Sequence, residues 1–321
     1  IRLARISFAL AKNKKALSYI NAVPDKNEYD ELSIQEFVRL FMDYNEYQEA
    51  IIFLDKIIDT NPYMYGAWYF KGLVYQRTEE YLKAVDAYEF CIAIDDSNTM
   101  GFLGKGNCLL ELAEYEKAIE AYHQSLDGDD TDAEVLCNIA ECYENLKDDV
   151  NAQSFYMKSI STNPNLSDAY FGLAMVFKRK NNFLAAERNL KQAIQIDKYE
   201  SLYYIELAEI YLQLGEKEKC YENYQNAYDL DSETTEILLD YAHSMVEMEE
   251  VEKAVDLLME HLENHDEDYR IYYRIAAYAY IVGKNEQANN FLHAALKMNP
   301  KKYMLLYEFA PFLENVENVP N

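Results

Sequence analysis

Histidines and paired acidic residues are the side chains in this sequence that could carry out acid–base chemistry or hold a metal ion. The histidines are His123, His243, His261, His265 and His293. None of them has the HExxH spacing of a metal site, and no acid stands at the required place between His261 and His265. No Gly-rich phosphate loop or GxSxG elbow is present, and Asp/Glu pairs are too numerous for one to stand out. The sequence therefore predicts a protein that is not an enzyme and needs no metal or cofactor.

The cysteines point the same way. They are Cys91, Cys108, Cys137, Cys142 and Cys220, an odd number with no CxxC pair. This pattern suits neither a disulfide framework nor a zinc site, and it favours a reducing compartment such as the cytoplasm.

The charge balance restricts the class of partner. With 57 acidic and 30 basic residues, the chain has a formal charge of −27 and a pI near 4.5. Such a chain repels phosphate backbones and anionic lipids, so we expect no nucleic-acid partner and favour an apolar or basic one. No run of about 18 apolar residues occurs, so no membrane span is expected.

Any binding side chains must be positioned by helices, because the sequence repeats with a helical period. Half of the 321 residues are hydrophobic, whereas only nine are Gly and six are Pro. Rows of 34 residues can be laid out without insertion or deletion from Glu31, Tyr65, Thr99, Ala133, Ser167, Ser201, Thr235, Tyr269 and Tyr303. One column holds eight alanines and a single cysteine, and a second column of small residues precedes it by twelve positions. Small side chains in two columns allow two helix backbones to approach closely.

Each row is predicted to be a helical hairpin. Large residues such as Tyr75 and Tyr88 stand three or four positions from the small ones, which is helical spacing in both halves of the row. Asn45, Gly215 and Gly283 lie at the middle of their rows and can adopt the left-handed conformation that closes a helix. The pairs Asn61-Pro62, Asn163-Pro164 and Asn299-Pro300 end rows, where proline stops the preceding helix.

Six residues of one row match a known repeat pattern position by position. They are Trp68, Gly72, Tyr75, Ala84, Tyr88 and Asp95. The chain resembles the tetratricopeptide repeat family over essentially its whole length. This resemblance implies an all-α, right-handed superhelical solenoid of about nine 34-residue helix-turn-helix repeats in a single domain, residues 1–321. We expect a partial repeat at 1–30, full repeats starting at 31, 65, 99, 133, 167, 201, 235 and 269, and a capping segment at 303–321.

Two residues depart from the family pattern. His261 replaces a small residue, so we expect looser packing in the hairpin of residues 235–268. Pro311 falls inside what would be another first helix, so we expect a break there and a terminal capping helix.

The resemblance also implies a function, because in this family the first helix of each hairpin lines a concave groove that binds protein. The groove positions of this chain are predicted at Tyr69, Leu73, Leu103, Asn107, Asn138, Phe171, Met175, Ile205, Leu239 and Tyr273. Family members that bind acidic carboxyl tails place Lys and Asn here, whereas this chain pairs Leu103 with Asn107, which disfavours that mode. An extended or helical peptide is favoured instead, with apolar side chains on the wall and its backbone held by Asn107 and Asn138. The alternative for each apolar position is contact with a neighbouring hairpin.

Other roles are open for the chain as a whole. Residues 235–268 hold twelve acidic residues and one basic, while residues 269–302 hold six basic and one acidic. This alternation could pair molecules into a homo-oligomer, although ordinary ion pairs on solvated faces are the favoured explanation. Residue 1 is Ile, and the first row starts part-way through a repeat. This leaves open a leader or more repeats before it, and also a role as the non-catalytic regulatory arm of a larger protein.

Overall fold

The computed structural model describes residues 30–126, 128, 131–264, 268–311 and 313. Within these residues the chain forms seventeen helices and no strand, which confirms the all-α prediction. The partial repeat expected at 1–30 lies, except for Asp30, outside the described residues, as do residues 312 and 314–321 of the expected capping segment.

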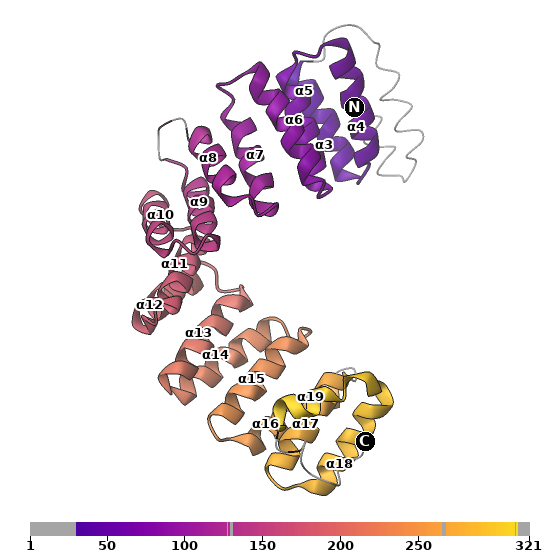
Figure 1. Cartoon of the computed structure of the whole chain (residues 1–321), viewed down its shortest axis with the longest axis vertical. Coiled ribbons are helices and arrows are strands. Elements are labelled where there is room, and N and C mark those ends of the chain that lie inside the picture. Colours follow the sequence, from indigo (N-terminus) through magenta and orange to yellow (C-terminus); the bar gives the residue numbers. More distant parts are fainter. Residues whose placement is uncertain (1–29, 127, 129–130, 265–267, 312, 314–321) are drawn as a thin grey trace. The chain divides into compact units, whose positions relative to one another are not determined.

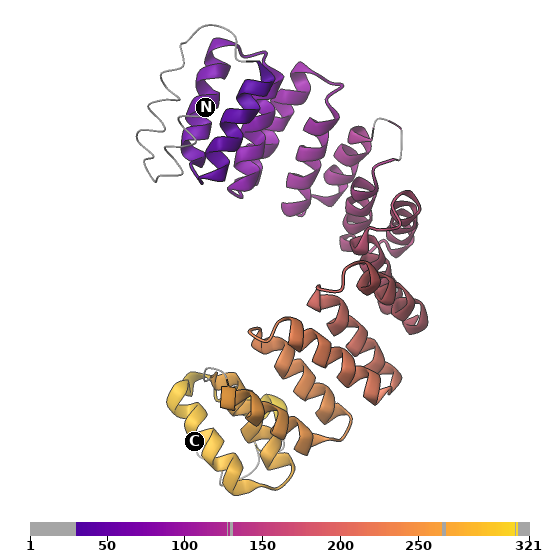
Figure 2. The same ribbon diagram turned by 180° about the vertical axis from the view of Figure 1, so that it is seen from behind.

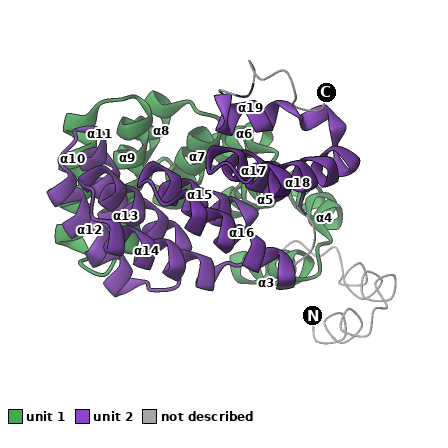
Figure 3. Ribbon diagram, turned by 90° about the horizontal axis from the view of Figure 1, so that it is seen from below, with its two compact units in different colours: residues 1–169 green, residues 170–321 purple. Residues whose placement is uncertain are grey.

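The chain divides into two compact units, residues 1–169 and residues 170–321 (Figure 3). Each unit is a stack of antiparallel helical hairpins (Figures 1 and 2). The prediction of one domain over residues 1–321 stays a prediction.

The helices follow the 34-residue rows. Those of unit 1 are α3 (Glu31–Asp43), α4 (Tyr47–Thr60), α5 (Tyr65–Arg77), α6 (Tyr81–Ile94), α7 (Thr99–Glu111), α8 (Tyr115–Ser125), α9 (Ala133–Asn145) and α10 (Asp149–Thr162). Helix α11 (Ser167–Arg179) contains the boundary between the units. Those of unit 2 are α12 (Phe183–Ile196), α13 (Ser201–Leu214), α14 (Lys217–Leu230), α15 (Thr235–Glu247), α16 (Val251–Asn264), α17 (Tyr269–Ile281), α18 (Asn285–Met298), the 3₁₀ turn η1 (Pro300–Lys302) and α19 (Met304–Phe309).

The turn inside each hairpin uses a left-handed residue at the same place in every row. Asn45, Gly215 and Gly283 adopt it as predicted, with φ between 58° and 76°. Five further residues at the same 34-residue interval also do so: Glu79, Ala113, Lys147, Asn181 and Glu249. The conformation lets the chain return amide donors to the end of the first helix, as in the Glu114 N–H bond to the Leu109 carbonyl at 2.9 Å. The turn geometry therefore belongs to the repeat and does not depend on glycine.

The small-residue columns lie in the core. All eight described members of the alanine column, including Cys220, are fully buried. Rings of the second helices show why the other column is small: a Cβ added to Gly72 would lie 2.8 Å from the Tyr88 ring, and one added to Gly106 would lie 2.7 Å from the Tyr122 ring. Aromatic side chains of the second helices thus fill space left by glycine and alanine on the first helices, as the pattern predicts.

The two departures from the pattern have clear structural outcomes. His261 is buried, and its Nδ1 lies 2.7 Å from the Tyr228 hydroxyl, so this larger side chain has a polar partner in the core. Helix α19 ends at Phe309, two residues before Pro311, as expected for a proline that cannot continue a helix.

Candidate protein-binding surfaces

First helices of successive hairpins place the predicted groove residues on equivalent faces. Tyr69 and Leu73 are one helical turn apart on α5, and Leu103 and Asn107 are one turn apart on α7, so each pair lies on one side of its helix. Those four side chains and Asn138 of α9 are all half-buried. They can therefore be reached from solvent while resting on the core of unit 1.

The apolar members in unit 1 rest on neighbouring rings and side chains. The Tyr69 ring lies 5.9 Å from the Tyr88 ring and 5.3 Å from the Phe70 ring, centroid to centroid. Burial raises the pKa of the Tyr69 hydroxyl, so this group is a neutral hydrogen-bonding group at physiological pH. Leu103 packs against the buried cluster around Leu109 and Tyr122.

The two amides predicted to hold a peptide backbone lie next to each other in the structure. Asn107 Oδ1 accepts a hydrogen bond from the Tyr122 hydroxyl at 2.9 Å and another from Asn138 Nδ2 at 3.5 Å. Among the described residues, Asn107 Nδ2 and Asn138 Oδ1 have no hydrogen-bond partner. The pair therefore offers one donor and one acceptor, which is what a peptide unit of a bound segment requires.

Carboxylates accompany these amides along unit 1. Partial burial raises the pKa of Glu141, and the nearby charges of Glu144, Glu111 and Asp168 raise it further. Four carboxylates close enough to perturb one another produce a negative local field, which favours a partner with basic groups.

In unit 2 the predicted residues divide into two sets. Phe171, Met175 and Ile205 are partly buried, and the Phe171 ring lies 5.2 Å from the Tyr203 ring. Leu239 is 7% exposed and Tyr273 is 0% exposed, and the Tyr273 hydroxyl donates to the Asn299 carbonyl at 2.9 Å. The structure therefore places Leu239 and Tyr273 in the core of unit 2, the alternative that the sequence left open for these positions.

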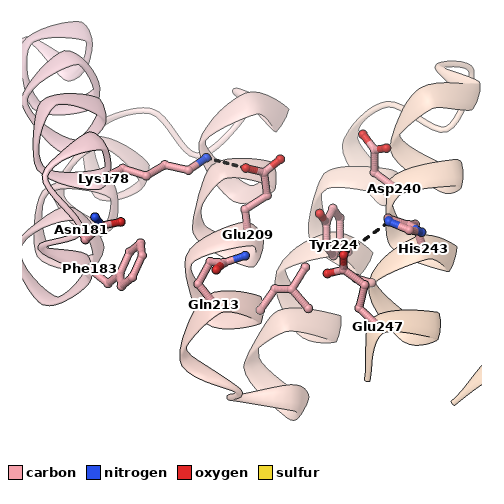
Figure 4. Close-up of a pocket in the computed structure, with 11 residues that line it drawn as sticks. Lys178, Asn181, Phe183, Glu209, Gln213, Tyr224, Asp240, His243 and Glu247 are labelled. Atoms are coloured by element: carbon pink, nitrogen blue, oxygen red, sulfur yellow. Dashed lines mark hydrogen bonds and ion pairs between the residues drawn. The ribbon is translucent and has the colours of Figure 1, made fainter. Parts of the chain in front are cut away.

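Unit 2 also contains a polar pocket, which the sequence did not predict. Its volume is about 410 Å³. Its polar lining includes Lys178 from α11, Glu209 from α13, Tyr224 from α14, and Asp240, His243 and Glu247 from α15 (Figure 4). Glu209 and His243 occupy the same repeat position as Asn107 and Met175, so the 34-residue interval was the signal that could have identified them.

Some charged groups of this pocket form ion pairs, and others have no direct partner. Lys178 Nζ bonds Glu206 at 2.5 Å and also bonds Glu209. Burial alone lowers the pKa of Lys178, but hydrogen bonds to the two carboxylates outweigh burial and raise it. His243 Nε2 lies 3.5 Å from Glu247.

Asp240 forms no hydrogen bond or ion pair with any described residue. Desolvation raises the pKa of its carboxyl; Arg274 and His243 oppose this rise, whereas Glu209 and Glu236 add to it. The pocket therefore contains a carboxylate whose charge is not compensated by a direct partner.

The repeat period seen in the helices also appears in a sequence comparison. A model of the tetratricopeptide repeat matches residues 26–319. The chain belongs to the tetratricopeptide repeat family. A search of curated proteins finds no match to it.

Solved structures agree with this family's fold. A tetratricopeptide repeat protein from Parabacteroides merdae is 14% identical with a TM-score of 0.55, over 78% of this chain and 99% of that one. The APC/C hetero-tetramer Cut9-Hcn1 contains a chain that is 17% identical with a TM-score of 0.51, over 93% of this chain and 59% of that one. YrrB, described as a TPR protein with an unusual peptide-binding site, is 16% identical with a TM-score of 0.47, over 58% and 95% of the two chains. At these identities the likeness to the first two structures shows the fold alone.

Charges on this tetratricopeptide repeat chain pair between neighbouring hairpins. Arg270 bonds both Glu236 and Asp268, and Lys284 lies 3.4 Å from Glu252. The sign alternation between residues 235–268 and 269–302 is thus partly used in ion pairs inside unit 2.

Within the described ranges, no group of three or more His, Cys, Asp or Glu side chains is arranged to hold a metal ion. No helix in the same ranges is both long and apolar enough to cross a membrane.

Proposed function

We propose that this chain is an interaction scaffold that binds a segment of another protein on the inner faces of its first helices. Tetratricopeptide repeats generally mediate protein–protein interaction. The observation that carries the proposal is the Asn107–Asn138 pair, which keeps a donor and an acceptor unused beside accessible apolar side chains.

The unit 1 surface suits an extended segment. A segment whose backbone meets Asn107 Nδ2 and Asn138 Oδ1 can place an apolar side chain on Leu103 and Tyr69, because these lie on the same helix face or on the adjacent first helix. Main-chain hydrogen bonds then hold the segment while apolar contacts select its sequence.

The unit 2 surface contains fewer accessible residues than the sequence suggests. The accessible residues are Phe171, Met175 and Ile205, whereas Leu239 and Tyr273 are buried in the core beneath this surface. A partner should therefore depend on the first three residues and not on contact with the last two.

The partner is proposed to combine apolar and basic residues. Apolar side chains match the accessible positions in both units, and the carboxylates near Glu141 in unit 1 and near Asp240 in unit 2 favour positive charge. A segment with an acidic tail is disfavoured by the same charges.

A random dodecapeptide display library selected on the whole chain tests the proposal. Peptides that bind the chain should lose at least tenfold in affinity on the triple variant Tyr69→Ala, Leu103→Ala and Phe171→Ala, measured by fluorescence polarisation. Circular dichroism must show that the variant remains helical, because Tyr69 also contacts the core.

The control variant removes three exposed apolar side chains from second helices instead. Leu82, Val150 and Leu184 are 67%, 75% and 69% exposed. Replacing all three by Ala should leave peptide affinity unchanged within twofold. Equal loss on both triple variants, or no peptide selected at all, would contradict the proposal.

A further inference from the structure

Tyr224 is a buried tyrosine whose hydroxyl has no partner. Its side chain is 2% exposed, yet no described residue forms a hydrogen bond with its hydroxyl. It lines the polar pocket of unit 2, and Figure 4 shows it between Glu209 and His243. The hydroxyl itself is not a fully buried unpaired atom, so it is open to the pocket and can bond a ligand that enters there.

Equivalent tyrosines in unit 1 show what Tyr224 lacks. The hydroxyls of Tyr88, Tyr122 and Tyr156 donate to Gln76, Asn107 and Glu144 at 2.9, 2.9 and 2.7 Å. Each acceptor stands on the first helix of the same hairpin. The sequence therefore builds a tyrosine–acceptor pair into three consecutive hairpins.

The hairpin of α13 and α14 breaks this rule in two ways. Leu212 stands where Gln76 and Glu144 stand in their rows, and a leucine cannot accept a hydrogen bond. Glu209 stands where Asn107 stands, but it is bonded to Lys178. As a result, the Tyr224 hydroxyl remains available within the pocket.

The charges around this hydroxyl favour a cationic ligand over an anionic one. Glu209, Asp240 and Glu247 line the pocket with one permanent cation, Lys178, and that cation is already shared between Glu206 and Glu209. A carboxylate or phosphate ligand would meet repulsion, whereas a cationic donor would gain from Asp240, which has no direct partner.

We propose that this pocket binds the guanidinium of an arginine side chain in the segment that the protein holds. This inference rests on the proposed function. A guanidinium has several N–H donors in one plane, so it can bond the Asp240 carboxylate with one edge and the Tyr224 oxygen with another. Its charge also persists when it is partly removed from water, which an ammonium does less readily.

The test uses peptides selected by display on the whole chain, each resynthesised with citrulline in place of arginine. Citrulline keeps the shape of arginine and removes its charge. We expect arginine to be enriched at one position and its citrulline form to bind at least tenfold more weakly. Asp240→Asn should weaken the arginine peptide about tenfold and the citrulline peptide less than twofold.

Variants of Tyr224 and of the equivalent Tyr156 separate pocket binding from a general effect on the fold. Tyr224→Phe should weaken the arginine peptide three- to tenfold, whereas Tyr156→Phe removes an equivalent hydroxyl in unit 1 and should leave affinity unchanged. Peptides that bind but show no arginine preference, or that bind Asp240→Asn equally well, would overturn the arginine pocket and leave the proposed function standing. If no peptide binds, both fail.

Discussion

Tyr88, Tyr156 and Tyr224 occupy the same repeat position, and replacing each by phenylalanine should reduce the free energy of unfolding by a different amount. Tyr88→Phe removes a 2.9 Å hydrogen bond to the neutral Gln76 amide, for which we expect a loss of about 0.5 to 1.5 kcal/mol in the free energy of unfolding. Tyr156→Phe removes a 2.7 Å bond to the Glu144 carboxylate, for which about 1.5 to 3 kcal/mol is expected. Tyr224→Phe removes no hydrogen bond within the chain, so it should change stability by less than about 0.5 kcal/mol.

Urea denaturation followed by far-UV circular dichroism measures the three values. Repeat proteins can unfold in several steps, so hydrogen exchange of amides in α6, α10 and α14 should accompany it and report each hairpin separately. The expected order of loss is Tyr156, then Tyr88, then Tyr224. A loss at Tyr224 as large as that at Tyr88 would refute the conclusion that the Tyr224 hydroxyl is unpaired.

Three further changes test other parts of the structure. Gly104→Ala should destabilise the chain by about 1 to 3 kcal/mol in thermal denaturation, because its Cβ would lie 2.4 Å from the Tyr88 ring; an unchanged melting temperature would contradict the close packing. Ala113→Gly should stabilise the chain by about 0.5 to 1 kcal/mol in urea, because Ala113 has φ 58°, where glycine avoids the strain of a Cβ; a loss of stability would show that this turn is not strained. Asp240→Asn should stabilise the chain at pH 7. The raised pKa of Asp240 means that the folded chain holds this proton more tightly than the unfolded chain does. The free energy of unfolding therefore falls as the pH rises from 3.8 through the folded pKa. Denaturation at pH 7 and at about pH 2.5 checks this, since the difference between the two proteins should vanish at the lower pH.

The fold was largely predictable because the repeat imposes the same packing in every row. The alanine column and the placement of Asn61-Pro62 and Asn163-Pro164 predicted closely packed hairpins and their ends, and α4 and α10 end at Thr60 and Thr162 as expected. The left-handed turn was recognised where Asn or Gly occupies it. It was missed at Ala113 and similar residues, because tertiary packing imposes the conformation on side chains that do not favour it.

The binding surface was less predictable, because repeat position alone does not fix exposure. Leu239 and Tyr273 share a repeat position with Tyr69 and Leu103, but they lie in the buried cluster of unit 2, where the Tyr273 hydroxyl bonds the Asn299 carbonyl. The Asn107–Asn138 pair joins residues on different hairpins, and the sequence named both without showing that they bond each other.

The pocket in unit 2 could not be predicted from the sequence, because recognising it requires the hydrogen-bond partners of its side chains. Tyr224 looks like every other tyrosine of its column in the sequence. Its difference comes from Leu212 on the facing helix and from the engagement of Glu209 by Lys178, and only a structure shows that Glu209 is already bonded. The leucine twelve positions before the tyrosine is only a partial sequence signal, because Leu110 stands there for Tyr122 and that hydroxyl still bonds Asn107.

Photocrosslinking is the most direct test of binding on the inner faces of the first helices. Benzoylphenylalanine is placed at Met175, on the proposed surface of α11, or at Leu184, which is 69% exposed on the second helix α12. Each protein is irradiated with a display-selected peptide, and the products are mapped by mass spectrometry. The proposed function predicts a crosslink from position 175 and none from position 184; a crosslink from position 184 alone would contradict it.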